Sequence, residues 1–123
     1  MSEKYRLLVV EDEFLIALDM IDALEDAGFD VVGPLPSVES AMQVVAASPR
    51  AFAGAILDVN LHGRLSFPIA DLLKSMQVPF IFTTGYHMDS IPPRFADTPV
   101  MEKPVEGKRL ANLMNDMLDS VPH

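Results

Sequence analysis

Residues 7–13 read LLVVEDE, and this stretch decides how the rest of the chain is interpreted. Four apolar residues in a row are typical of a strand that is buried on both faces, as in a parallel sheet. The run stops at three carboxylates, Glu11, Asp12 and Glu13. Because ligands bind beyond the carboxyl ends of the strands in such sheets, the stretch indicates a fold class and the place of a site.

Further apolar runs predict the remaining strands of the sheet. They are Val31-Val32, Ala55-Ile56-Leu57, Phe80-Ile81-Phe82 and the weaker Val100-Met101. Helical patterns separate these runs, so the chain alternates strand and helix from end to end. We therefore expect one α/β domain over residues 1–123, in which helices cover both faces of a five-stranded parallel sheet.

The predicted helices have recognisable starts and stops. The first runs from Glu13 to Ala27 and is stopped by Gly28, and the second runs from its cap at Ser37 to Ala47. The third begins at a Ser66 cap and has Pro68 in its first turn. The last has apolar residues at helical spacing from Leu110 to Val121. The segment from Asp89 to Asp97 contains two consecutive prolines and is at best a short helix with proline near its start.

Composition excludes several classes of protein. The 123 residues include 9 Lys plus Arg and 18 Asp plus Glu, a formal net charge of −9, and half are hydrophobic. The chain is too apolar for disorder, and its acidity argues against a nucleic-acid partner. Without cysteine there is no disulfide framework and no thiolate zinc site. The apolar run behind Met1–Arg6 is too short for a leader or a membrane span, so we expect a cytoplasmic protein with no membrane partner.

Polar side chains also follow the other predicted strands. Asp58 follows the third, Thr83 and Thr84 end the fourth, and Lys103 follows the fifth. Crowded carboxylates repel unless a cation lies among them, and oxygen ligands without Cys or His point to Mg²⁺. A metal, a lysine and a hydroxyl around a carboxylate nucleophile suit phosphoryl transfer.

Each residue also has a plain structural interpretation. Asp12 alone fits a helix N-cap, Asp58 alone a turn residue, and Thr84 alone the start of an ordinary loop. Glu13 is interpreted as a helix residue that favours the dipole, and His62 as a solvated loop residue. The conjunction of all the motifs in this order is what favours a site.

In that order, the motifs resemble the receiver domain of two-component response regulators, from Tyr5 to about Val121. The resemblance implies the flavodoxin-like (βα)5 fold with strand order 2-1-3-4-5. The run from Pro79 to Tyr86 is similar to the FAT GUY subfamily of largely stand-alone receivers, although Thr83 replaces its Ala and Tyr86 directly follows Gly85. The resemblance implies a phosphoacceptor protein and no enzyme in the ordinary sense, beyond its own phosphotransfer and dephosphorylation.

The resemblance also implies a role for each acidic residue. Asp58 matches the phosphoacceptor, which attacks a phosphohistidine and becomes an aspartyl phosphate. Asp12 matches a direct Mg²⁺ ligand, and Glu11 matches a partner that reaches the ion through water. Asn60 matches the position whose backbone carbonyl binds the metal, and Asp58 is itself a ligand.

The remaining matches concern the phosphoryl group and the signal. Thr84 matches the hydroxyl that follows the phosphoryl group, and Lys103 matches the lysine that binds a phosphoryl oxygen. The bond from Lys103 to Pro104 is usually cis in this family. Val100 occupies the position where many receivers carry a Tyr or Phe that swings inward. We therefore expect another route of signal transmission, through the loop at Tyr86 and the proline-rich segment after it.

The function implied is that of a single-domain response regulator without an effector domain. A sensor histidine kinase or a histidine phosphotransfer protein donates the phosphoryl group, Mg²⁺ is the cofactor, and the output is protein binding or phosphorelay. We expect a monomer or a weak dimer. Two alternatives stay open: a phosphate sink that competes for a shared kinase, and a non-phosphorylated, protein-binding pseudo-receiver. A hydrolase-like phosphatase is disfavoured because Asn60 stands where that chemistry commonly wants a second Asp.

Overall fold

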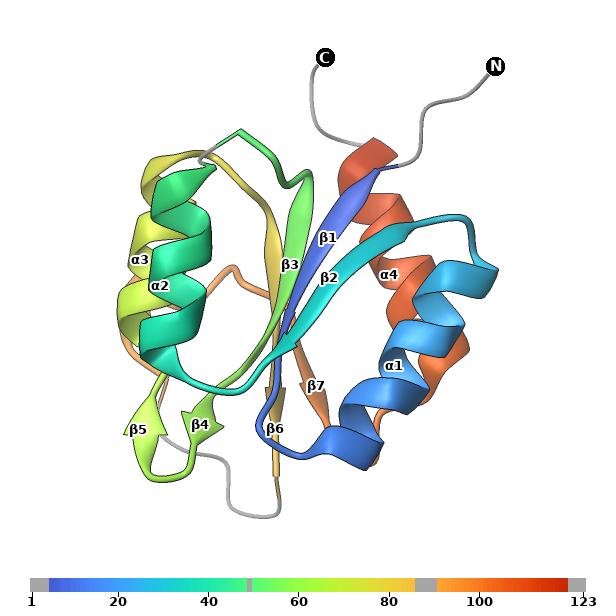
Figure 1. The fold of residues 1–123 in the computed structure, drawn as a ribbon, viewed down its shortest axis with the longest axis horizontal. Coiled ribbons are helices and arrows are strands. Elements are labelled where there is room, and N and C mark those ends of the chain that lie inside the picture. The colour runs from blue at the N-terminus through green and yellow to red at the C-terminus, as the bar shows by residue number, and fades with distance from the viewer. Residues whose placement is uncertain (1–4, 49, 86–90, 120–123) are drawn as a thin grey trace.

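The computed structural model describes residues 5–48, 50–85 and 91–119. Five parallel strands form one sheet in the order β2-β1-β3-β6-β7 (Figure 1). They are β1 (Arg6–Val10), β2 (Asp30–Leu35), β3 (Gly54–Asp58), β6 (Phe80–Thr84) and β7 (Val100–Glu102). Counted along the sheet strands alone, this is the expected order 2-1-3-4-5, so the flavodoxin-like fold is confirmed.

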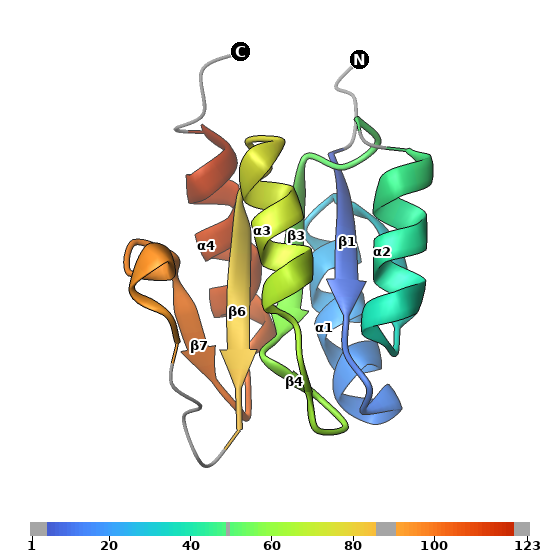
Figure 2. The ribbon, with the colours of Figure 1, turned by 90° about the vertical axis from the view of Figure 1, so that its left-hand side faces the viewer.

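Four α-helices of the described chain cover the sheet. They are α1 (Phe14–Asp26), α2 (Val38–Ala47), α3 (Phe67–Ser75) and α4 (Gly107–Asp119). Figures 1 and 2 show α1 and α4 on one face and α2 and α3 on the other, and each face encloses its own apolar cluster. Strands with cores on both sides explain the unbroken apolar runs in the sequence. The predicted end of the last helix at Val121 lies outside the described residues.

The helix ends confirm two of the three sequence assignments. Gly28 follows α1 with φ +98°, a conformation that glycine adopts without cost. Ser37 caps α2, and its hydroxyl accepts a hydrogen bond from the backbone of Ser40. Ser66 is the N-cap residue of α3, as predicted, and Pro68 lies in the first turn, but the predicted side-chain cap is wrong. Ser66 has φ −85° and ψ 8° in place of the extended conformation of a capping residue, and its side chain makes no cap bond.

The crossover between β6 and β7 contains no regular α-helix within its described part. A 3-10 turn, η1 (Pro93–Phe95), begins at the second proline, in keeping with the short helix predicted there. Phe95 is buried, and its ring centroid lies 5.4 Å from that of Phe82 and 5.7 Å from that of Phe67. Aromatic packing therefore fixes a segment that has little helical structure of its own.

A short hairpin between β3 and α3 was not predicted. β4 (Asn60–Leu61) pairs antiparallel with β5 (Arg64–Leu65) across a two-residue turn. His62 and Gly63 both have positive φ, 51° and 85°, which is the type I′ geometry that matches the twist of a hairpin. Figure 2 shows the arrowheads of β1, β6 and β7 at the lower edge, where the hairpin also lies. The hairpin therefore borders the carboxyl ends of the strands.

Among residues 5–48, 50–85 and 91–119, no helix has the length and apolar character needed to cross a membrane.

Candidate functional site

Lys103 lies among carboxylates at the carboxyl edge of the sheet. Its Nζ donates to Asp58 Oδ2 at 2.9 Å and to Glu11 Oε1 at 3.0 Å. Glu13 Oε1 lies 3.5 Å from the same nitrogen. The lysine side chain is only 11% exposed, and those of Glu11 and Asp58 are buried. One largely buried ammonium group therefore faces three carboxylates.

Parallel strand pairing brings these distant residues together. Glu11 directly follows β1, and its backbone N–H donates to β2 at 3.0 Å. Asp58 is the last residue of β3 and stands opposite Thr83 of β6. Lys103 directly follows β7, and its backbone N–H donates to the carbonyl of Thr84 at 2.7 Å. Each side chain thus extends from the end of a strand whose neighbour is fixed by sheet hydrogen bonds.

Burial and charge shift the proton affinities of the cluster. Burial, together with the nearby charge of Asp58, raises the pKa of Glu11 to about 7, against the lowering effect of Lys103. Burial likewise raises the pKa of Asp58, although hydrogen bonding to Lys103 opposes the change. Burial alone would lower the pKa of Lys103, but hydrogen bonds to Asp58 and Glu11 raise it overall. The lysine thus stays charged, while Glu11 and Asp58 hold a proton more readily than exposed carboxyl groups do.

Asp12 belongs to the same edge but has a different partner. One oxygen each of Glu11, Asp12 and Glu13 lies within 4.8 Å of the others. Asp12 Oδ2 accepts the backbone N–H of His62 at 2.8 Å, and His62 Nδ1 lies 3.2 Å from the same oxygen. The position before α1 is Glu13, which makes no side-chain cap bond. Asp12 therefore does not serve as the N-cap of α1 and bonds instead across 50 positions of sequence.

Asp58 uses its two oxygens in two ways. Oδ2 accepts from Lys103, while Oδ1 accepts the backbone N–H of Asn60 at 3.2 Å. Asp58 is therefore a turn residue through Oδ1, as its plain structural interpretation has it, and a member of the charged cluster through Oδ2. Asn60 also accepts the N–H of Gly63 through its side-chain Oδ1 at 2.6 Å, within the hairpin turn.

Thr84, the residue predicted to follow the phosphoryl group, lies beside this cluster, because its carbonyl accepts the backbone N–H of Lys103. Thr84 is buried, and its hydroxyl oxygen has no hydrogen-bond partner among the described residues. A cavity of about 440 Å³ is lined by Thr84, Val100 and Pro104, among others. Val100 is 37% exposed, and the bond between Lys103 and Pro104 is cis as expected. Tyr86, the proposed element of the signalling route, lies outside the described residues.

Sequence reasoning missed two contributors to the site. The sequence predicts Glu13 only as a residue at the start of the helix, yet its carboxylate lies 3.5 Å from Lys103 Nζ. His62 is 79% exposed, in agreement with a solvated loop residue, yet it contacts Asp12. A His-Gly turn between short apolar-polar pairs was the available signal, but it is weaker than the Asn-Gly or Asp-Gly pairs that announce such hairpins.

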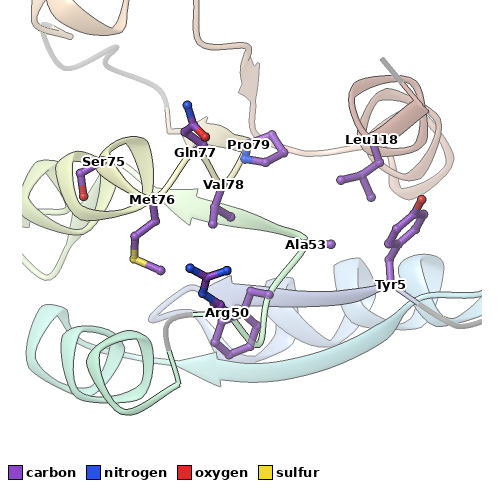
Figure 3. Close-up of a pocket in the computed structure, with 10 residues that line it drawn as sticks. Tyr5, Arg50, Ala53, Ser75, Met76, Gln77, Val78, Pro79 and Leu118 are labelled. Atoms are coloured by element: carbon purple, nitrogen blue, oxygen red, sulfur yellow. The ribbon is translucent and has the colours of Figure 1, made fainter. Parts of the chain in front are cut away.

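A second hollow lies at the opposite end of the sheet. Figure 3 shows this cavity, of about 730 Å³, with side chains such as Tyr5, Arg50, Met76 and Leu118 around it. Its described lining contains one charged side chain, that of Arg50, and no carboxylate. Its described lining therefore differs from the carboxyl edge, where carboxylates gather around Lys103.

The sequence and the structure of this chain were compared with those of known proteins. No family model matches the sequence. The solution structure of SdrG from Sphingomonas melonis Fr1 is 39% identical with a TM-score of 0.82, and the match covers 96% of this chain and 99% of that one. A structure of the BeF3-activated conformation of SdrG, from Pseudomonas melonis Fr1, is 38% identical with a TM-score of 0.75 over the same shares.

Two further matches cover different shares of this chain. The phyllosphere-induced regulator PhyR of Methylorubrum extorquens is 37% identical over 83 residues, which are 65% of this chain but only 30% of PhyR. A response regulator receiver protein from Sinorhizobium medicae WSM419 shares the fold at 21% identity, with a TM-score of 0.82 over 96% of this chain and 97% of that one. With the strand order and the near-complete match to SdrG, these findings show that the chain belongs to the family of response regulator receiver domains.

Proposed function

We propose that Asp58 accepts a phosphoryl group from the phosphohistidine of a sensor histidine kinase or of a histidine phosphotransfer protein. The contact that carries this proposal is the one between Lys103 Nζ and Asp58 Oδ2, at 2.9 Å and largely buried. A buried carboxylate beside one ammonium, at the ligand-binding edge of a parallel sheet, is suited to receive an anionic group.

The donor set fits a divalent cation. Three carboxylates, those of Glu11, Asp12 and Glu13, have oxygens within 4.8 Å of one another, and burial raises the pKa of Glu11 to about 7. This cluster of oxygen ligands supports Mg²⁺ as the cofactor, held by Asp12 and Asp58, by Glu11 through water and by the backbone carbonyl of Asn60. When bound, the cation neutralises charge on the phosphoryl oxygens.

The side chains of the cluster have separate parts in the proposed transfer. A carboxylate oxygen of Asp58 forms a bond to phosphorus, while the bond from phosphorus to the donor imidazole breaks and its electrons return to that nitrogen. Lys103 holds a phosphoryl oxygen by charge and hydrogen bonding. The unpartnered hydroxyl of Thr84 supplies a further hydrogen bond to the group.

In this proposal the receiver acts in the cytoplasm, and once phosphorylated it signals by binding a protein or by passing the phosphoryl group on. The BeF3-activated conformation of SdrG, a relative with 38% identity, supports a change in structure that depends on phosphorylation. Val100 leaves the usual aromatic position without a ring, which supports an output route different from an inward-swinging Tyr or Phe. Its exposure and the adjoining cavity agree with this view.

Intact mass spectrometry tests the proposal. The protein is incubated with a small phosphodonor, with Mg²⁺ or with a chelator, beside Asp58→Asn and the control Asp97→Asn, an exposed carboxylate on the turn after η1. We expect wild type and Asp97→Asn to gain one base-labile phosphoryl group with Mg²⁺ only. An unmodified wild type, or an equal gain in Asp58→Asn, would overturn the proposal. The lifetime of the product separates a messenger from a phosphate sink.

A further inference from the structure

The hairpin between β3 and α3 reaches back to the acidic edge through its turn. The backbone N–H of His62 donates to Asp12 Oδ2 at 2.8 Å, and His62 Nδ1 lies 3.2 Å from that oxygen. The Asp12 side chain is 7% exposed, whereas that of His62 is 79% exposed. A surface residue thus fixes one oxygen of a nearly buried carboxylate.

The turn is held in place from both sides. Asn60 receives the N–H of Gly63 on its side-chain oxygen at 2.6 Å and donates its own N–H to Asp58 Oδ1 at 3.2 Å. Leu61 is buried in the core beneath α2 and α3. At the base of the hairpin, the N–H of Ser66 donates to the carbonyl of Val59 at 2.9 Å. These contacts aim the His62 amide at Asp12 whether or not the exposed imidazole is ordered.

We propose that His62 is a positioning residue for Asp12, and that the type I′ turn of the β4–β5 hairpin sets the geometry of the metal site. The inference rests on the proposed function, because it takes Asp12 as a ligand of the divalent cation. With Oδ2 held by His62, the described residues leave Oδ1 without a hydrogen bond and open to the ion. Partners that orient a ligating carboxylate typically contribute ten- to a hundredfold to metal affinity.

Two substitutions separate the amide from the imidazole. Gly63→Val places a β-branched residue at φ +85°, where no atom lies near the new Cβ, so it acts on the turn and not on packing. His62→Ala removes the imidazole and keeps the backbone N–H. We expect Gly63→Val to weaken Mg²⁺ binding about tenfold and His62→Ala about two- to fivefold.

Gly28→Val is the matched control. Gly28 has φ +98° and equally open space, but it follows α1 at the other end of the sheet. The dissociation constant for Mg²⁺ is measured at one pH from amide chemical shifts, and the unfolding free energy of each variant is measured beside it. We expect both valine variants to lose similar stability, while only Gly63→Val loses metal affinity. His62 amide exchange should quicken in Gly63→Val alone.

The outcomes separate the two proposals. Unchanged Mg²⁺ affinity in both Gly63→Val and His62→Ala, or an equal loss in Gly28→Val, would overturn the role of His62 and leave Asp58 phosphorylation untouched. A wild type that binds Mg²⁺ but gains no phosphoryl group would contradict the proposed function while the binding data still decide on His62. A wild type that does not bind Mg²⁺ would overturn both.

Discussion

Two ion-paired regions of the molecule differ in burial and in their balance of charge. Arg94 of η1 donates from Nε and Nη2 to the two oxygens of Asp71 on α3, at 2.8 and 3.0 Å, and both side chains are half exposed. Lys103 makes equally short contacts to Asp58 and Glu11, but within a largely buried cluster. Good geometry is therefore common to both regions and does not distinguish them.

The difference lies in what surrounds the charges. At the surface one cation meets one anion, and hydrogen bonding to Arg94 lowers the pKa of Asp71. At the sheet edge one cation meets several carboxylates, and burial raises the pKa of Glu11 and Asp58. In the surface pair the cation favours the ionised form of its carboxylate, whereas in the buried cluster burial outweighs the effect of Lys103 on Glu11 and Asp58. Buried groups with raised pKa values at the edge of a sheet are the kind of cluster from which the site is proposed.

Removing the ammonium group should have the largest effect. Lys103→Met leaves two buried carboxylates without their cation, and breaking a buried pair in this way costs about 3–5 kcal/mol. We expect a loss of unfolding free energy of that size in chemical denaturation at pH 7.5 with a chelator present. Lys108→Met, at an exposed position of α4, is the matched control and should change little. If Lys103→Met loses less than about 1 kcal/mol of unfolding free energy, the buried cluster contributes no more to stability than an exposed ion pair does.

The pH dependence of stability should come next in size. Because the folded pKa of Glu11 is raised from 4.5 to about 7, the folded protein holds a proton that the unfolded chain has released in this window. The free energy of unfolding therefore falls as the pH rises from about 4.5 to about 7, by up to about 3 kcal/mol. The raised pKa of Asp58 acts in the same direction.

Glu11→Gln isolates this contribution. The difference in unfolding free energy between wild type and Glu11→Gln, measured by denaturation with a chelator across the same window, should change by most of that amount. A difference that stays flat with pH would show that Glu11 titrates normally in the folded state.

Breaking the surface pair should have the smallest effect. Exposed ion pairs contribute at most about 1 kcal/mol, and salt screens them. Arg94 also lies over the ring of Phe95, 4.6 Å from its centroid, so a single substitution removes two contacts. A double-mutant cycle of Arg94→Ala and Asp71→Ala isolates the pair, and we expect a coupling below about 1 kcal/mol that shrinks in high salt. A coupling energy above about 2 kcal/mol would show that the exposed pair stabilises the protein on the scale expected of the buried cluster.

The strands of the sheet could be predicted from the sequence because strands that are buried on both faces appear as unbroken apolar runs. The apolar run 7–10 and its counterparts became the five strands, and their order followed the resemblance. Asp58 and Lys103 were predicted to lie together because parallel strands place their carboxyl ends at one edge, and their side chains are indeed in contact. Their chemical roles remain predictions.

The hairpin and its contact could not be predicted in the same way. The bond between His62 and Asp12 joins residues 50 positions apart and depends on a turn of only two residues. Ser66 has the residue type and position of a helix cap, but its backbone N–H is bonded to Val59 at the base of the hairpin and its side chain makes no cap bond. Such contacts depend on tertiary placement and leave no periodic trace in the chain.

Thermal unfolding with and without Mg²⁺ tests most directly whether the carboxylate cluster is a cation site. Wild type, Asp12→Asn and the surface control Asp71→Asn are melted at pH 7.5 and constant ionic strength, in a chelator and in Mg²⁺. A tenfold excess over the dissociation constant stabilises the folded state by about 1.4 kcal/mol, which raises the melting temperature by several degrees. We predict that rise in wild type and in Asp71→Asn but not in Asp12→Asn. A wild type that melts at the same temperature in both solutions would contradict the account.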